Sequence, residues 1–98
     1  MFLLIDSKGG LSLEDSDNCR EFSVVEEVDG TAAAALAAIA EPAEADHFWL
    51  DAEAVIELSG RKQDQVWVEG FWDMLEKVQA YGYSDMAAKR VKAHLVKP

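Results

Sequence analysis

Two histidines and one cysteine are the residues of this chain best suited to bind a metal ion. His47 and His94 are far apart in the sequence, and Cys19 is near neither of them. A structural zinc site takes about four nitrogen or sulfur ligands, usually at short regular spacings. The two histidines could still meet if their strands are neighbours, but isolated histidines on a small sheet are usually ordinary side chains. The sequence therefore predicts no metal site and no cofactor.

Cys19 lies in an acidic stretch, with Glu14, Asp15, Asp17 and Glu21 around it and only Arg20 opposing them. Negative neighbours disfavour the thiolate, which is the reactive form of cysteine. A nucleophilic role is therefore not predicted. A single cysteine also cannot form a disulfide within the chain, which fits the reducing environment of the cytoplasm.

Carboxylates are numerous, but none is singled out as catalytic. The segment 6–17 is rich in Asp, Gly and Ser, yet alignment of Gly10 with the sixth-position glycine of a calcium loop places Ile5 and Ser16 at its two ends. An EF-hand is therefore excluded. Glu26 and Glu27 alternate on a predicted strand, so one of them could face the helices and become a candidate acid–base group. A solvated position at the strand end is the preferred interpretation. Phosphate-loop, dinucleotide and nucleophile-elbow motifs are absent, and no catalytic residue is predicted.

The segment "VWVEGFWDML" at 66–75 contains two of the three tryptophans. At about 100° per residue in a helix, one stripe roughly 120° wide collects the large apolar residues, as is typical of a core-facing side. Its members are Trp67, Phe71, Met74, Leu75, Val78 and Tyr81. Most of this aromatic surface is therefore predicted to belong to the core.

Trp72 lies about 60° beyond that stripe, with Val68 and Gln79 beside it. A tryptophan in water leaves a large apolar surface unburied, and tryptophan is enriched at interfaces. A loop or the C-terminal segment of the same chain, a second copy of the protein, or a small ligand or other partner could cover it. Trp72, Val68 and Gln79 form the candidate interface, and a homodimer is the preferred intermolecular arrangement.

The charge of the chain is negative and uneven. The 98 residues carry a net charge of −10; residues 1–60 hold fourteen acids and two bases, whereas residues 61–98 hold five acids and seven bases. Such a surface repels nucleic acid and anionic membranes, so neither is an expected partner. The acidic composition is typical of a bacterial cytosolic protein. The start "MFLLIDSKGG" has no basic region and predicts a strand, not a signal peptide.

Strands are predicted from composition at 2–6, 21–28, 47–51 and 90–96, with a shorter one at 11–13. Helices are predicted after the N-caps Thr31, Asp51 and Asp64, at 32–40, 52–59 and 65–81, with Gly60 and Gly82 as terminators. Residues 41–46 are predicted to form a polar linker, and residues 83–89 are predicted to form a helical turn. Two alternatives stay open: a strand that continues from 47 through Ile56, and a helix at 90–96.

These elements predict one α+β domain over residues 1–98, with two layers: a small, mostly antiparallel sheet of three or four strands and two or three helices on one face. The leading functional prediction is a non-enzymatic interaction or assembly module that acts as a homodimer or beside a larger partner. The alternative is a small ligand-binding or catalytic domain with a pocket between the sheet and the long helix. His47, Trp49 and His94 are the candidate pocket residues for that alternative.

Overall fold

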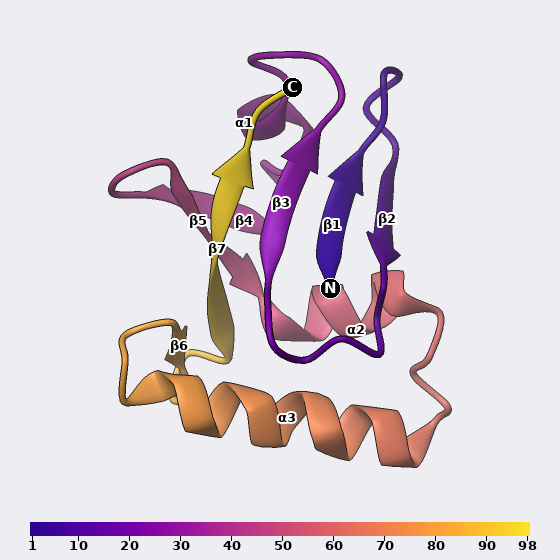
Figure 1. Cartoon of the computed structure of the whole chain (residues 1–98), viewed down its shortest axis with the longest axis vertical. Helices are drawn as coiled ribbons and strands as arrows, with labels where there is room; N and C mark the ends of the chain where they lie inside the picture. The colour runs from indigo at the N-terminus through magenta and orange to yellow at the C-terminus, as the bar shows by residue number, and fades with distance from the viewer.

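A computed structural model describes the whole chain, from Met1 to Pro98. It contains seven strands and three helices (Figure 1). In chain order they are β1 (Phe2–Ile5), β2 (Leu11–Glu14), β3 (Ser23–Glu26), α1 (Ala32–Ala35), β4 (Ala40–Ala43), β5 (His47–Asp51), α2 (Ala52–Ser59), α3 (Gln65–Gln79), β6 (Ser84–Asp85) and β7 (Arg90–Val96). No helix of the structure is both long enough and apolar enough to cross a bilayer.

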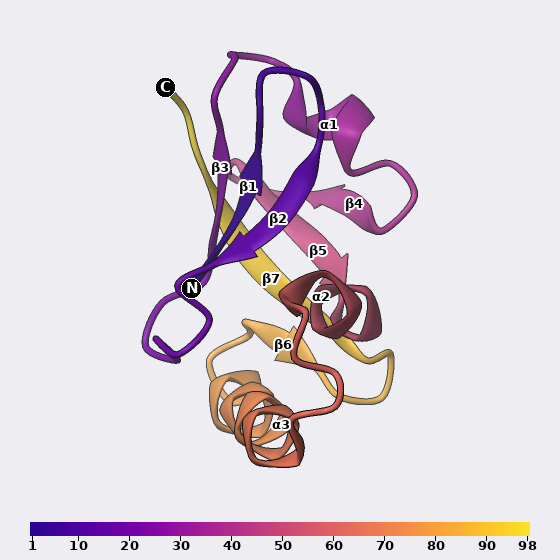
Figure 2. The same ribbon diagram turned by 90° about the vertical axis from the view of Figure 1, so that its right-hand side faces the viewer.

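All strands belong to one mixed sheet with the order β2-β1-β3-β7-β5-β4, and β6 lies off this path and pairs with the first two residues of β7. The pairs β1–β3 and β3–β7 are parallel, and the other pairs are antiparallel. Figure 2 shows α1 and α2 on one side of the strands and α3 beyond their lower end. The chain is therefore α+β, as a single sheet with helices at its side and end.

The predicted sheet of three or four mostly antiparallel strands is wrong. Strands β1, β3, β5 and β7 lie where the sequence predicts strands, and β2 covers the short strand predicted at 11–13. Two further strands, β4 and β6, were not predicted, and the centre of the sheet is parallel. Strand β1 pairs with β3 in parallel orientation.

Strand β4 falls on residues predicted as the end of a helix and a polar linker. Its residues Ala, Glu and Pro are poor strand formers, but the chain folds back through Ala45 and Asp46, both with positive φ, and pairs with β5. Because β4 is at the edge of the sheet, Pro42 interrupts no central ladder. Pairing with an adjacent strand has here overridden local propensity.

The first helix is much shorter than predicted. Helix α1 has four residues, and Thr31 makes no capping hydrogen bond with its side chain; its hydroxyl donates instead to the carbonyl of Val28 at 2.7 Å. The carboxylate of Glu26 takes the capping role from the end of β3. Its two oxygens accept hydrogen bonds from the backbone N–H groups of Gly30, at 3.2 Å, and Ala32, at 3.0 Å.

The other two helices begin as predicted. Asp51 accepts a hydrogen bond from the N–H of Glu53 at 3.2 Å, and Asp64 accepts one from the N–H of Trp67 at 3.1 Å. Helix α2 occupies 52–59, so the alternative of a strand through Ile56 is wrong, as is a helix at 90–96. Helix α3 ends at Gln79, two residues earlier than predicted.

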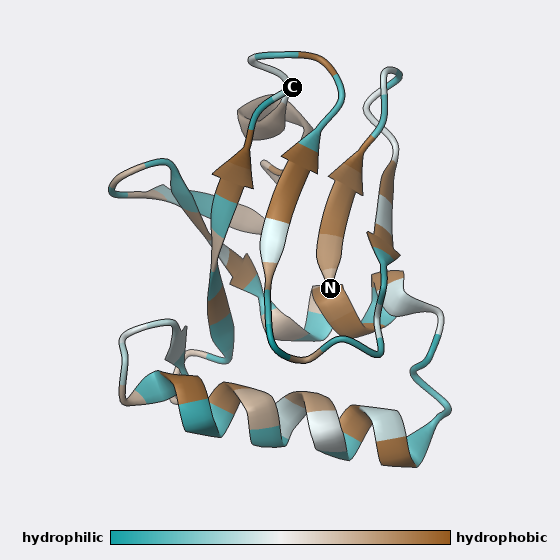
Figure 3. Cartoon of the chain, in the orientation of Figure 1, coloured by the Kyte–Doolittle hydropathy of each residue, from teal (hydrophilic) through white to brown (hydrophobic).

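The core lies between the inner side of the sheet and the helices. The strands bury alternate residues, and Leu3, Ile5, Val24 and Leu50 are fully inaccessible to solvent. Figure 3 shows the hydrophobic character of β1 and β3 and the alternation of hydrophobic and polar residues along α3. From α3 the core receives Trp67, Phe71, Met74 and Leu75, which confirms most of the predicted stripe. Tyr81 is the exception, 77% exposed, because it follows the end of the helix.

Candidate functional site

A groove with a volume of about 410 Å³ lies between β7, α3 and the segment that leads into β3. The floor is apolar and includes Met74, Val78 and Val91, of which Met74 and Val91 are buried. Tyr83 and Val96 line it too and are 49% and 40% exposed. The remaining lining residues are Cys19, Arg20, Glu21, Phe22, Ser23, Lys92 and His94.

The groove exists because two strands, β3 and β6, pair with different parts of the same edge of β7. Strand β3 pairs with its final residues, His94–Val96, and β6 pairs with its first two, Arg90 and Val91. Between the two partners the edge is open, apart from the hydrogen bond that the N–H of Lys92 donates to the carbonyl of Tyr83 at 2.8 Å. Apolar side chains of α3 lie next to this opening and form part of its lining.

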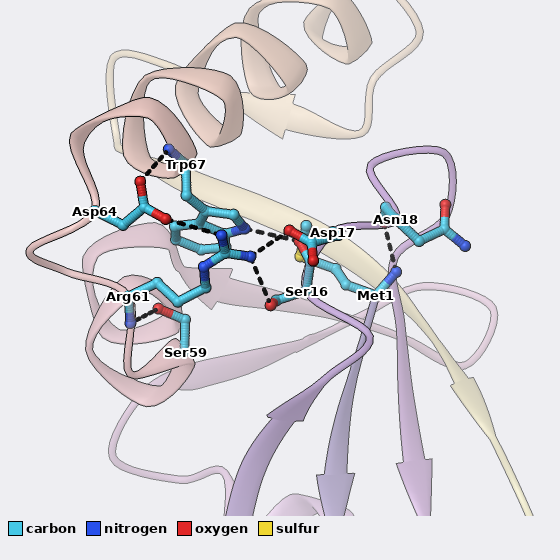
Figure 4. A network of polar contacts seen from close by, with 8 residues as sticks. All are labelled: Met1, Ser16, Asp17, Asn18, Ser59, Arg61, Asp64 and Trp67. Carbon is cyan, nitrogen blue, oxygen red and sulfur yellow. Dashed lines mark hydrogen bonds and ion pairs between the residues drawn. The ribbon is translucent and has the colours of Figure 1, made fainter.

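A polar network holds the loop before β3 near the start of α3 (Figure 4). The indole N–H of Trp67 donates to the carbonyl of Ser16 at 2.7 Å. The guanidinium of Arg61 donates to the carboxylate of Asp17 and, at 2.8 Å, to that of Asp64. Arg61 also lies 5.6 Å from the centre of the Trp67 ring. The loop whose continuation lines the groove is thereby tied to both ends of the α2–α3 connection.

The charges of this network stabilise one another. The hydrogen bonds that Arg61 donates to Asp17 and then to Asp64 raise the pKa of Arg61 above its ordinary value. The hydrogen bond from Arg61, followed by that from the N–H of Trp67, lowers the pKa of Asp64. The cap of α3 is therefore ionised at neutral pH.

The other side of the same loop is held by the terminal ammonium of Met1. This group donates hydrogen bonds to the carbonyls of Asn18, at 2.7 Å, and Glu21, at 2.8 Å. The side chain of Met1 is buried in the core. The segment that carries Cys19 and Arg20 is thus fixed at both flanks, although both residues are exposed.

The predicted pocket residues His47, Trp49 and His94 come together on neighbouring strands, but they do not share a cavity. His47 lies opposite His94 in the β5–β7 pairing, with their ring centres 5.3 Å apart. The Nδ1 atom of His47 lies 2.8 Å from the carbonyl oxygen of Ala45. Only His94 lines the groove. No group of three or more His, Cys, Asp or Glu residues is arranged to hold a metal ion.

Trp49 borders a second, smaller hollow of about 280 Å³ near α1 and β4. The Arg90 guanidinium lies 4.3 Å from the centre of the Trp49 ring, and the Lys92 ammonium lies 5.1 Å from it. These cations are themselves paired: Arg90 with Glu41 at 3.9 Å, and Lys92 with Glu44. The hydrogen bond from Lys92 also lowers the pKa of Glu44. The cations around Trp49 are therefore paired within the chain, although the buried Nε atom of Arg90 has no hydrogen-bond partner.

The candidate interface residues lie on α3, with Trp72 and Val68 half-buried against the core. The ring of Trp72 meets Phe71 edge to face, with the centres 5.9 Å apart. The side-chain oxygen of Gln79 accepts a hydrogen bond from the N–H of Met86 at 2.8 Å, which ties the segment after β6 to the end of α3. The same chain thus supplies part of the contact around this helix.

Several lining residues of the groove were not selected from the sequence. Arg20, Phe22 and Tyr83 come from segments without a periodic pattern, and only the pairing of β7 with two partners brings them together. Comparison with known proteins gives no match of this chain to a family model, to a curated protein or to a solved structure.

Proposed function

We propose that this chain is a cytoplasmic binding module for a small molecule, which occupies the groove between β7 and α3. The groove itself carries the proposal: about 410 Å³ is within the range of small-molecule sites, and the apolar floor with a few polar groups around it is typical of them. The position corresponds to the predicted pocket between the sheet and the long helix, with His94 among its lining residues. The network around Arg61 holds one wall of the groove in place before a ligand binds. Binding therefore loses less conformational entropy than it would with a mobile wall.

The test is a titration with octanol, a neutral apolar probe, followed through the backbone amide signals of the protein in NMR spectra. We expect saturable shifts at Phe22 and Ser23, around the start of β3, and at Val91 in β7, all of which line the groove. Val78→Trp should place a large side chain in the groove and abolish these shifts. Lys77→Trp adds the same ring on an exposed neighbour and should leave them intact. Shifts that survive in Val78→Trp, or that scatter over the surface, would refute a site in this groove.

A homodimer through α3 is the second candidate, and one observation favours it. Trp72 keeps part of its ring in solvent, although the rest of the ring packs against the core. A tryptophan that is half-exposed on a helix is suited to a two-fold contact, in which it meets its counterpart or a near neighbour.

Sedimentation at micromolar concentration tests this second candidate. We expect the parent chain to form dimers and Trp72→Ala to raise the dissociation constant about tenfold or more, as for a central interface tryptophan. The melting temperature of the monomeric Trp72→Ala variant should fall much less than that of a variant truncated at a core residue, because Trp72 is only half-buried. A parent chain that sediments as a monomer would refute the dimer.

A further inference from the structure

We infer that the ligand of the groove is a small organic anion with an apolar body, whose acidic group is held at the rim by Arg20 with His94 beside it. This inference rests on the proposed function and adds the chemical class of the ligand. Three observations carry it: the charge of the lining, the unpaired state of Arg20, and the apolar floor.

Basic side chains outnumber acidic ones in the lining of the groove, whereas acids outnumber bases in the whole chain. Acids outnumber lysines and arginines by nineteen to nine in the sequence, whereas the groove is lined by two of these bases, Arg20 and Lys92, by one acid, Glu21, and also by His94. In a protein of net charge −10, an anion is repelled by most of the surface. The groove is therefore a place where an anion meets cationic groups and an apolar surface together.

Arg20 is free to bind a ligand, whereas most other bases are occupied. Arg61, Lys62, Lys89, Arg90 and Lys92 all form ion pairs within the chain. Lys92 lines the groove but gives its ammonium to Glu44. The guanidinium of Arg20 forms no ion pair and no hydrogen bond, while its backbone N–H donates to the side chain of Asn18 at 3.0 Å. Arg20 thus has a fixed backbone and an uncommitted charged group at the rim.

The second polar group is His94, which lines the groove from β7, is exposed, and makes no hydrogen bond with its ring. A guanidinium presents several N–H donors in a plane that matches a carboxylate. An imidazole nearby adds a further donor. Arg20 and His94 both line the groove and can meet an acidic group at its rim, and the surface of Met74, Val78 and Val91 in the same groove suits the hydrocarbon part.

Three probes of the same length and different charge test the inference: octanoate, octanol and octylamine. Titrations followed at the amide signals of Phe22, Ser23 and Val91 should give octanoate the lowest Kd and octylamine the highest. Arg20→Gln should weaken octanoate binding about three- to fivefold, as expected for an ion pair at a solvent-exposed rim. The same substitution should leave octanol binding unchanged.

Lys8→Gln is the matched control, because Lys8 is also an exposed, unpaired base but lies in the β1–β2 turn, away from the lining. It removes one positive charge and should not change the affinity for octanoate. Equal effects of the two substitutions would mean that only net charge matters and would overturn the inference. Equal binding of octanoate and octanol, unaffected by Arg20→Gln, would overturn the inference that the ligand is an anion. The groove would then remain the proposed site of binding. Absence of binding by all three probes would refute the proposed function as well.

Discussion

Truncation of Phe71 to alanine is expected to lower the free energy of unfolding by about 3–5 kcal/mol. Phe71 is fully inaccessible to solvent and lies at the centre of the aromatic contacts of α3. Its ring stacks on Trp67, with centres 5.4 Å apart, and meets Trp72 edge to face at 5.9 Å. The substitution removes the buried ring and leaves a cavity between two rigid neighbours that cannot close fully.

Chemical denaturation of the parent and the variant measures this loss. Because domains of this kind are held by about 5–15 kcal/mol, Phe71→Ala should be close to the limit of stable folding. Val66→Ala is the matched control on the same helix, since Val66 is 81% exposed, and it should change stability by no more than about 0.5 kcal/mol. A variant at Phe71 with the denaturation midpoint of the parent would show that α3 is packed with a different face inward.

The phase of α3 could be predicted because it depends on local information. Large apolar residues recur at helical spacing, and Asp64 provides the cap at the start. The same holds for α2 with Asp51 and for the alternation of buried residues in β7. Tyr81 was wrongly assigned to the buried stripe, because the predicted helix was continued beyond Gln79, where the helix ends.

The sheet could not be predicted to the same extent, because strand partners depend on contacts between distant segments. Nothing local in β4 favours a strand; it exists because β5 offers an edge. The parallel pairs of β3 with β1 and β7 join segments from both ends of the chain. The number of strands and their orientation are therefore properties of the assembled sheet.

The candidate site, like the fold, could be predicted from the sequence only in part. Selection by residue type identified His94, which lines the groove, and also His47 and Trp49, which lie on neighbouring positions of the sheet but outside the groove. Arg20 was treated only as a charge near Cys19. Its importance for the groove depends on the loop that Arg61 and Met1 hold in place, and that arrangement has no counterpart in a sequence pattern.

The second large effect is expected at Glu26, one of two buried polar residues in the chain. Glu26 is only 1% exposed, and its carboxylate accepts hydrogen bonds from the N–H groups of Gly30 and Ala32. These belong to the turn and the first position of α1, where backbone donors have no partner within the helix. Glu26→Gln turns one oxygen into an NH₂ group that faces an N–H donor, and it removes the charge from the other bond. We expect a loss of about 2–3 kcal/mol in the free energy of unfolding, as for hydrogen bonds to charged groups.

The expectation that both carboxylates of this pair lie in solvent is wrong for Glu26, which is buried. Chemical denaturation of Glu26→Gln beside Glu27→Gln tests its capping role. Glu27 is the exposed neighbour, so its substitution should change stability by about 0.5 kcal/mol or less. A loss confined to Glu26→Gln would identify its carboxylate as the structural cap of the β3–α1 turn. If Glu26→Gln is instead as stable as the parent, or more stable, the buried charge does not hold the turn.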